Sequence, residues 1–133
     1  MTIYIDESIR DLVRPGVASV PPETTLREVA SMLTEEEVGL LVVTGPEGML
    51  GVISERDIAA ALADGADPDE VWASDVMSDE PICLDQEDSV LFAANHMIDD
   101  GVRHLPILAS GNVIGMVSIR DVLRALTDAV RLS

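Results

Sequence analysis

Hydrophobic residues recur with helical spacing in two segments of the chain. In TTLREVASML the apolar positions i, i+3, i+4 and i+7 predict an amphipathic helix with one buried face. These positions are Leu26, Val29, Ala30 and Leu33. Thr25 stands before this run and Glu28 follows three residues later, a capping-box spacing that predicts the helix start. The segment SVLFAANHMIDDG has the same spacing, and its inward positions are Val90, Ala93, Ala94 and Met97.

Aliphatic runs around turn residues predict paired strands. GLLVVTGPEGMLGVIS places two such runs on either side of GPEG, and HLPIL and VIGMVS flank ASGN in the same way, so each stretch predicts a β-hairpin. The short runs VASV and PICL predict a further strand ahead of each helix. After the hairpins, ERDIAAALADG and IRDVLRALTDAV each predict the last helix of a repeat. The first of these two helices ends at Asp64 and Gly65.

The two halves of the chain align with each other without a gap. Gly51 aligns with Gly115, and residues 11–62 align with residues 75–126 at the same separation of 64 residues. Eleven of these 52 pairs are identical, and many others exchange one aliphatic residue for another. The chain is therefore a tandem duplication.

The predicted fold is α/β (α+β), with two β-α-β-β-α repeats in residues 1–66 and 67–133 that are related by pseudo-twofold symmetry. One small sheet with two helices buries little surface by itself, so we expect the repeats to pack through their sheets and to form a cleft there. In the connector, Asp67 and Pro68 have the order of a helix cap and a first helical residue. We expect Trp72 to be a packing anchor between the repeats.

Composition narrows the kinds of core and partner. Apolar residues make up 47% of the chain but aromatic residues only 2%, so the core must be aliphatic and few side chains can stack on nucleobases. The 25 acidic against 8 basic residues give a net charge of -17, which argues against nucleic acid as a general partner. The acidic residues spread along the whole chain, as in the solvating surfaces of proteins from salt-accumulating, halophilic cells.

Cysteine usage and hydropathy indicate a cytoplasmic protein. Cys83 has no second cysteine with which to form a disulfide, and its place in the apolar PICLD favours a buried, inert thiol. The chain shows no cationic leader before an apolar run and no apolar stretch of the roughly 18 residues that a membrane helix needs. We therefore expect a soluble protein without membrane contact.

The segments GVISERD and GMVSIRD share a Ser-x-x-Asp spacing at the start of the last helix of each repeat. Ser54 and Ser118 stand at expected N-caps, and Asp57 and Asp121 can reach back to the cap N–H, so capping alone explains the motif. The same helix starts present N–H donors and a positive dipole end, which suit a phosphate or ribose oxygen. Each aspartate also follows an arginine that would add anion affinity, Arg56 and Arg120. Both readings stay open, since a serine cap keeps hydrogen-bonding capacity.

Several sequence motifs of the chain occur in both repeats and follow one another in the same order in each. These are the duplicated GVISERD and GMVSIRD, DDGVRHLPIL, SDVMSDEPICL, and DLVRPGVASV with the helix after it. From about Ser8 to Leu126 the chain resembles a tandem pair of cystathionine β-synthase (CBS) domains, a Bateman module. The resemblance implies a regulatory module that binds AMP, ADP, ATP, S-adenosylmethionine or NAD between its repeats. It also implies a disc-shaped homodimer, and we expect any effector protein to be a separate polypeptide.

The resemblance further implies roles for single residues. Asp57 and Asp121 would accept hydrogen bonds from ribose hydroxyls, and Ser54 and Ser118 would contact ribose or phosphate. We call Ser54 with Asp57 the first corner, and Ser118 with Asp121 the second corner.

The segment VRHLP supplies a second group of candidate ligand contacts. By the resemblance, Arg103 and His104 would reach ligand phosphates across the cleft and complete the first corner. From the residues alone, a solvated arginine and a partly buried histidine are an equally good interpretation. The aligned residues in the first repeat are Gly39 and Leu40, so the two sites are predicted to be chemically unequal.

The resemblance also implies that adenine is held by apolar side chains and backbone groups near the first strand of each repeat. This contact maps onto Ala18 and Ile82. Ile82 offers more apolar surface than Ala18, so adenine packing favours the second corner whereas phosphate contacts favour the first. The sequence leaves this conflict open.

The chain contains no arrangement typical of catalysis: no Ser-His-Asp context, no Walker loop and no Cys/His metal spacing. His96 lies within a predicted helix without a metal-ligand partner, which favours a structural role. We expect no catalytic cofactor, and Mg²⁺ would act only with ligand phosphates. The leading hypothesis is a non-enzymatic sensor that binds an adenine nucleotide and signals to a separate effector. The alternative is a degenerate, ligand-free CBS pair that serves as a dimeric interaction scaffold.

Overall fold

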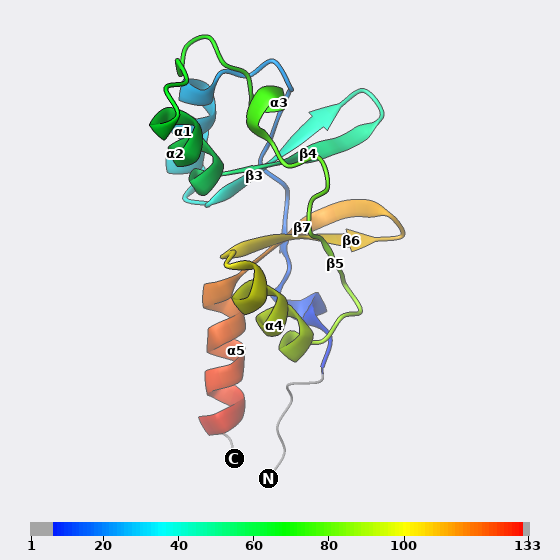
Figure 1. The fold of residues 1–133 in the computed structure, drawn as a ribbon. Coiled ribbons are helices and arrows are strands. Elements are labelled where there is room, and N and C mark those ends of the chain that lie inside the picture. The colour runs from blue at the N-terminus through cyan, green and yellow to red at the C-terminus, as the bar shows by residue number, and fades with distance from the viewer. Residues whose placement is uncertain (1–6, 132–133) are drawn as a thin grey trace. The chain divides into compact units, whose positions relative to one another are not determined.

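The computed structural model describes residues 7–131 as two compact units (Figure 1). One unit comprises Val17–Pro81, and we call it the 17–81 unit. The other combines residues 7–16 with residues 82–131, and we call it the 82–131 unit. Each unit is a small mixed sheet with helices packed against it, so the predicted mixed fold of two repeats is confirmed.

The 17–81 unit has a three-stranded sheet in the order β2-β3-β4. Strand β2 pairs parallel with β3, and β3 pairs antiparallel with β4, as a hairpin requires. Its elements are β2 (Ser19–Val20), α1 (Leu26–Glu36), β3 (Leu40–Gly45), β4 (Gly48–Ser54), α2 (Glu55–Ala63) and α3 (Ala73–Val76). A β-bulge interrupts the hairpin register between Val43 and Thr44.

The 82–131 unit has a four-stranded sheet in the order β1-β7-β6-β5. Strand β5 pairs parallel with β6, while β7 pairs antiparallel with both β6 and β1. Its elements are the 3₁₀ helix η1 (Ile9–Leu12), β1 (Arg14–Pro15), β5 (Leu84–Asp85), α4 (Val90–Asp100), β6 (His104–Ala109), β7 (Asn112–Ser118) and α5 (Ile119–Arg131). Its hairpin carries a bulge between Ile107 and Leu108, the positions aligned with those in the first repeat.

Each unit has its own aliphatic core, formed where the apolar helix faces meet the sheet. The predicted inward residues of α4 are all buried: Val90, Ala93, Ala94 and Met97. In α1 the predicted face is also buried, with Ala30 packed at its margin and Leu26, Val29 and Leu33 inside. The helical periodicity thus predicted correctly which side of each helix meets the core.

Each unit is completed by the segment that precedes the other repeat's main elements. The N–H of Ile9 in η1 donates to the Asp88 carbonyl at 2.8 Å, and its side chain is fully buried in the core of the 82–131 unit. At the aligned position, Ala73 of α3 donates to the Thr24 carbonyl at 2.7 Å and is equally buried in the 17–81 unit. The compact units are therefore divided differently from the sequence repeats 1–66 and 67–133.

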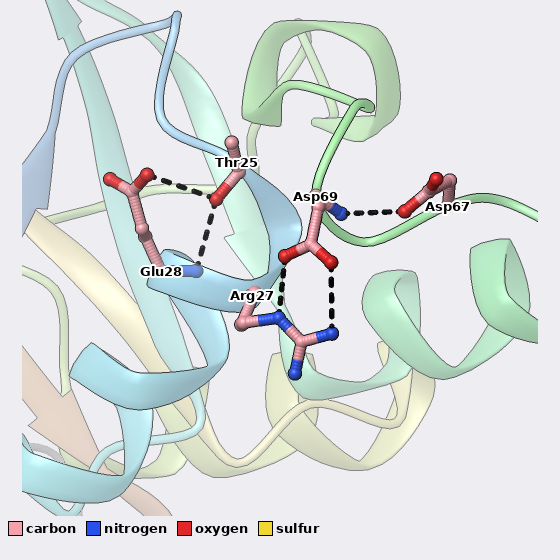
Figure 2. Close-up of polar contacts among 5 residues, drawn as sticks. All are labelled: Thr25, Arg27, Glu28, Asp67 and Asp69. Atoms are coloured by element: carbon pink, nitrogen blue, oxygen red, sulfur yellow. Dashed lines mark hydrogen bonds and ion pairs between the residues drawn. The ribbon is translucent and has the colours of Figure 1, made fainter.

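The connector forms a turn where we predicted a helix start. Residues 68–70 make a single turn, in which the Asp67 carboxylate accepts the Asp69 N–H at 2.9 Å. Figure 2 shows how this turn is joined to α1. The Asp69 carboxylate accepts hydrogen bonds from Arg27 Nε at 2.5 Å and from Arg27 Nη2 at 3.1 Å. The helix begins later, after Trp72, whose N–H donates to the Asp75 carboxylate at 3.0 Å. Trp72 itself is 46% exposed.

The start of α1 is close to its prediction. Thr25 is the N-cap, and its hydroxyl oxygen accepts the Glu28 N–H at 3.3 Å (Figure 2). The Glu28 carboxylate accepts a hydrogen bond from that same hydroxyl at 3.1 Å. The helix begins at the predicted residue, with both residues of the predicted pair engaged.

Candidate functional site

The first corner lies where β4 ends and α2 begins. Ser54 is the N-cap of α2, and its hydroxyl accepts the Asp57 N–H at 3.1 Å. In return, Asp57 Oδ2 accepts the Ser54 N–H at 2.9 Å, which closes a reciprocal capping box. Both side chains are half-buried, and Oδ1 is the carboxylate oxygen that the capping box does not use.

The second corner lies at the aligned place, where β7 ends and α5 begins. The Ser118 hydroxyl accepts the Asp121 N–H at 3.1 Å, as Ser54 does for Asp57. The carboxylate differs, because Asp121 Oδ2 accepts Nε of Arg14 at 2.8 Å and Oδ1 accepts Nη2 at 3.1 Å. Hydrogen bonding from Arg14 lowers the pKa of Asp121 below its ordinary value, while partial burial acts in the opposite direction. The two motifs match in sequence but hold their carboxylates differently.

The two motif arginines lie in the first turns of their helices. Arg56 in α2 and Arg120 in α5 are both exposed, a position from which a guanidinium can meet an anion at the helix start. Arg120 also lines an open hollow along α5. The other residues of this hollow are Leu123, Arg124, Thr127 and Asp128. The hollow therefore lies on the outer face of α5 and includes neither Ser118 nor Asp121.

Arg103 and His104 lie in the same unit as the second corner. His104 begins β6 and faces Ser118 across the antiparallel pair, while the Arg103 carbonyl accepts the Ile119 N–H at 2.8 Å. Arg103 is exposed and His104 is half-buried. Their predicted contribution to the first corner would join residues of the two units, and it stays a prediction.

Ala18 and Ile82 lie just before the first strands of their repeats. Ala18 is half-buried, and its carbonyl accepts the Val42 N–H at 3.1 Å. In the second repeat the residue aligned with Val42 is Pro106, which has no N–H to donate to the Ile82 carbonyl. Both first strands are shorter than predicted, since β2 pairs only over Ser19–Val20. The missing N–H of Pro106 accounts for β5 pairing only from Leu84 onwards, one aligned position later than β2. Ile82 is 39% exposed, so its apolar side chain is accessible.

The other side chains that could react, those of Cys83 and His96, are held in packing contacts within the fold. Cys83 is half-buried, not buried as predicted, and burial raises the pKa of its thiol, which lowers the thiolate fraction at neutral pH. His96 packs edge-on against Phe92 and its Nδ1 lies 3.3 Å from an Asp100 oxygen. Within residues 7–131, no three His, Cys, Asp or Glu side chains are grouped closely enough to hold a metal ion. The same residues include no helix with the length and apolar character needed to cross a membrane.

Arg14 is the residue of this site that sequence reasoning missed. It is 107 positions away from Asp121, and nothing in the local pattern indicates that β1 pairs with β7. The repeat alignment places Ser78 opposite Arg14, which is the one available signal that the two corners have different neighbours.

Comparisons with known proteins identify the family. The family model described as CBS domain matches twice, over residues 9–64 and 73–128. An uncharacterized protein of Methanopyrus kandleri is 33% identical over 120 residues, which cover 88% of this chain and 61% of the relative. The mitochondrial CBS domain-containing protein CBSX3 of Arabidopsis thaliana is 34% identical over 115 residues, which cover 82% of this chain and 56% of the relative. The chain thus spans about three fifths of the length of these two relatives.

A solved structure agrees with the sequence matches. A CBS domain protein from Pyrobaculum aerophilum, complexed with AMP, superposes with a TM-score of 0.79 at 32% identity. The superposition covers 91% of this chain and 98% of that structure. With two family matches, relatives above 30% identity and this common fold, the chain belongs to the CBS domain family, of which it carries a tandem pair.

Proposed function

We propose that this CBS pair is a regulatory module that binds an adenine nucleotide and signals to a separate effector protein as a homodimer. The observation that carries the proposal is the AMP complex of the Pyrobaculum aerophilum relative, which is 32% identical and is covered over 98% of its length. The matched family is a regulatory domain, and no catalytic family is indicated for this chain. The candidate ligands are AMP, ADP, ATP and S-adenosylmethionine.

The two corners are the proposed ribose contacts. Asp57 and Asp121 would accept hydrogen bonds from the ribose hydroxyls, while Ser54 and Ser118 keep their caps and contact ribose or phosphate. At the first corner the capping bond uses Oδ2, so Oδ1 would be the carboxylate oxygen that meets a ribose hydroxyl. A ligand can therefore bind there without breaking the start of α2.

The remaining proposed contacts concern the phosphates and the base. Arg56, Arg120, Arg103 and His104 would supply positive charge for ligand phosphates, with Mg²⁺ only as a bridge between phosphates. Ala18 and Ile82 would contact adenine. Because Pro106 withholds a hydrogen bond from the Ile82 carbonyl, that carbonyl suits the amino group of adenine better than the Ala18 carbonyl does.

One observation favours the alternative of a ligand-free scaffold: both corner carboxylates already have partners within the chain. Isothermal titration with AMP, ADP, ATP, S-adenosylmethionine and NAD at high salt decides between the two functions. We expect heat of binding with at least one of them. No heat of binding with any of the five compounds would contradict the sensor function and support the scaffold function.

The site residues are tested by the double variant Asp57→Ala/Asp121→Ala. It should abolish the ligand-induced rise in melting temperature, because the proposed ribose acceptors are gone. Asp75→Ala is the matched control, since Asp75 also accepts a cap N–H, that of Trp72 at 3.0 Å, but lies outside the proposed site. This control should lose some stability and keep the ligand response.

A further inference from the structure

Arg14 occupies the carboxylate of the second corner. Its guanidinium donates to both oxygens of Asp121, from Nε at 2.8 Å and from Nη2 at 3.1 Å, in a bidentate ion pair. The Asp121 side chain is only 15% exposed, whereas the Arg14 side chain is 72% exposed. The Asp121 side chain is therefore largely covered, whereas its partner Arg14 lies mostly in solvent.

The backbone around this ion pair is repeated almost identically at the first corner. Arg14 pairs with Met116 of β7, and at the aligned place Ser78 exchanges two backbone hydrogen bonds with Val52 of β4, at 3.0 and 2.9 Å. The two corners therefore receive the same edge segment, and they differ in the side chain that this segment carries.

Aligned glycines keep that edge segment close in both units. A Cβ on Gly115 would lie 2.3 Å from the Arg14 carbonyl oxygen, and a Cβ on Gly51 would lie 2.2 Å from the Ser78 carbonyl oxygen. The edge segment thus approaches the glycine equally closely in both units. The backbone is therefore alike at the two corners, and the difference between them lies in the side chain at residue 14 or 78. Residue 14 brings a guanidinium to its aspartate, and residue 78 brings a hydroxymethyl group.

We propose that Arg14 is a specificity-determining residue that competes with the ribose hydroxyls for Asp121 and so weakens the second corner relative to the first. This inference rests on the proposed nucleotide binding. A ribose diol needs the carboxylate oxygens that the guanidinium holds, so Arg14 must leave before the diol can bind. Ser78 imposes no such step at the first corner.

The exposure of Arg14 sets the size of the effect. Exposed ion pairs are weak, so displacement of Arg14 lowers the affinity by about two- to fivefold and does not abolish binding. Salt screens such pairs, so the penalty becomes smaller as the ionic strength rises. Arg14 thus acts as a graded competitor whose strength depends on the ionic conditions.

The test measures AMP binding at one corner at a time by isothermal titration. In Asp57→Ala, which leaves the second corner, we expect Arg14→Ser to raise the AMP association constant about two- to fivefold at low salt, and less at high salt. Arg14→Gln is a second variant that keeps most of the side-chain length, and it should act in the same direction. In Asp121→Ala, which leaves the first corner, Arg14→Ser should change nothing.

The reverse substitution provides a matched control. Ser78→Arg in the Asp121→Ala background should weaken AMP binding at the first corner by a similar factor, because it installs the guanidinium at the aligned position.

Unchanged or weaker binding on Arg14→Ser in the Asp57→Ala background would overturn the inference, and weaker binding would make Arg14 a ligand contact. If the unmodified protein binds none of AMP, ADP, ATP, S-adenosylmethionine and NAD, the proposed function fails and the inference fails with it. AMP binding with equal affinities for both Arg14 forms removes the inference alone.

Discussion

Ser54 and Asp57 use for helix capping the same polar groups that a ribose would contact. The hydroxyl of Ser54 and the Oδ2 of Asp57 are bound in the capping box, which does not use Oδ1. At the second corner the equivalent carboxylate is held by Arg14, so no second oxygen is available without a displacement. Two identical motifs therefore differ through a residue that lies outside both.

Removing the cap hydroxyl should separate its structural role from its binding role. Ser54→Ala should lower the free energy of unfolding by about 1 kcal/mol, because the Asp57 N–H loses its acceptor. Ser89→Ala should cost about the same, since the Ser89 hydroxyl accepts the Phe92 N–H at 3.0 Å at the start of α4. Urea denaturation measures both changes, and AMP titration should show a weaker response only in Ser54→Ala. Equal AMP affinity in the two variants would show that Ser54 is a cap alone.

The Arg14 ion pair should also be visible in the pH dependence of stability. The folded-state pKa of Asp121 lies below its ordinary value of 3.8, so its stabilisation is complete above that value and is lost as the pH falls through the lower folded pKa. Arg14→Gln removes the first cause of this shift. The stability difference between the two proteins should therefore be constant from about pH 5 to pH 8 and shrink in stronger acid. Acid titration followed by circular dichroism measures it, and a difference that grows below the ordinary pKa would contradict the assignment.

At the scale of elements, η1 belongs to the core of the 82–131 unit although it comes from the start of the chain. Ile9→Ala should lower the free energy of unfolding by about 2–4 kcal/mol, because the Ile9 side chain is fully buried. Ile98→Ala is the matched control, since this isoleucine of α4 is 72% exposed and its replacement should change stability by less than about 0.5 kcal/mol. Chemical denaturation of both variants tests the assignment. Equal, small losses would mean that η1 is not part of the core.

The close approach of the edge segments gives a second prediction at this scale. Gly51→Ala should destabilise the 17–81 unit by about 1–3 kcal/mol or more, because the new Cβ would lie 2.2 Å from a backbone oxygen that cannot rotate away. Gly45→Ala is the control, since its nearest neighbours are side-chain atoms of the exposed Leu50, which can change rotamer. Thermal unfolding compares the two, and a larger loss in Gly45→Ala would contradict the packing described for β4.

Local patterns predicted most elements and the partners within both hairpins, but they did not predict that β1 pairs with β7. The α1 helix begins after Thr25 and α2 after Ser54, as their caps indicate, because these signals act within one helical turn. Both β2 and β5 are shorter than VASV and PICL suggested, and β5 starts one aligned position later than β2 because Pro106 on its partner strand cannot donate a hydrogen bond. Arg14 was missed because a contact over 107 residues has no local signature. For the same reason, the alignment of Ser78 with Arg14 indicates a difference between the two corners only once the pairing of β1 with β7 is known.

At the scale of the whole molecule, a net charge of -17 is carried by a chain of 133 residues. The core clusters are aliphatic and contain no charged side chain, so these charges lie at or near the surface, where they repel one another. The described ion pairs, such as Arg27 with Asp69, neutralise only a few of them. Compaction brings like charges together, and dissolved salt reduces this cost by shortening the range of their repulsion to about 3 Å at 1 M.

Stability should therefore rise with salt concentration. We expect the melting temperature to increase by about 3–8 °C between 0.1 M and 1 M KCl, which corresponds to about 1–2 kcal/mol for a chain of this size. Glu35→Gln/Glu36→Gln removes two exposed negative charges near the end of α1, so it should raise the melting temperature at low salt and reduce the dependence on KCl. A general effect of salt on apolar hydration would leave that dependence unchanged in the variant. The slope of melting temperature against KCl concentration in the two proteins thus distinguishes charge repulsion from hydration as the reason for salt stabilisation.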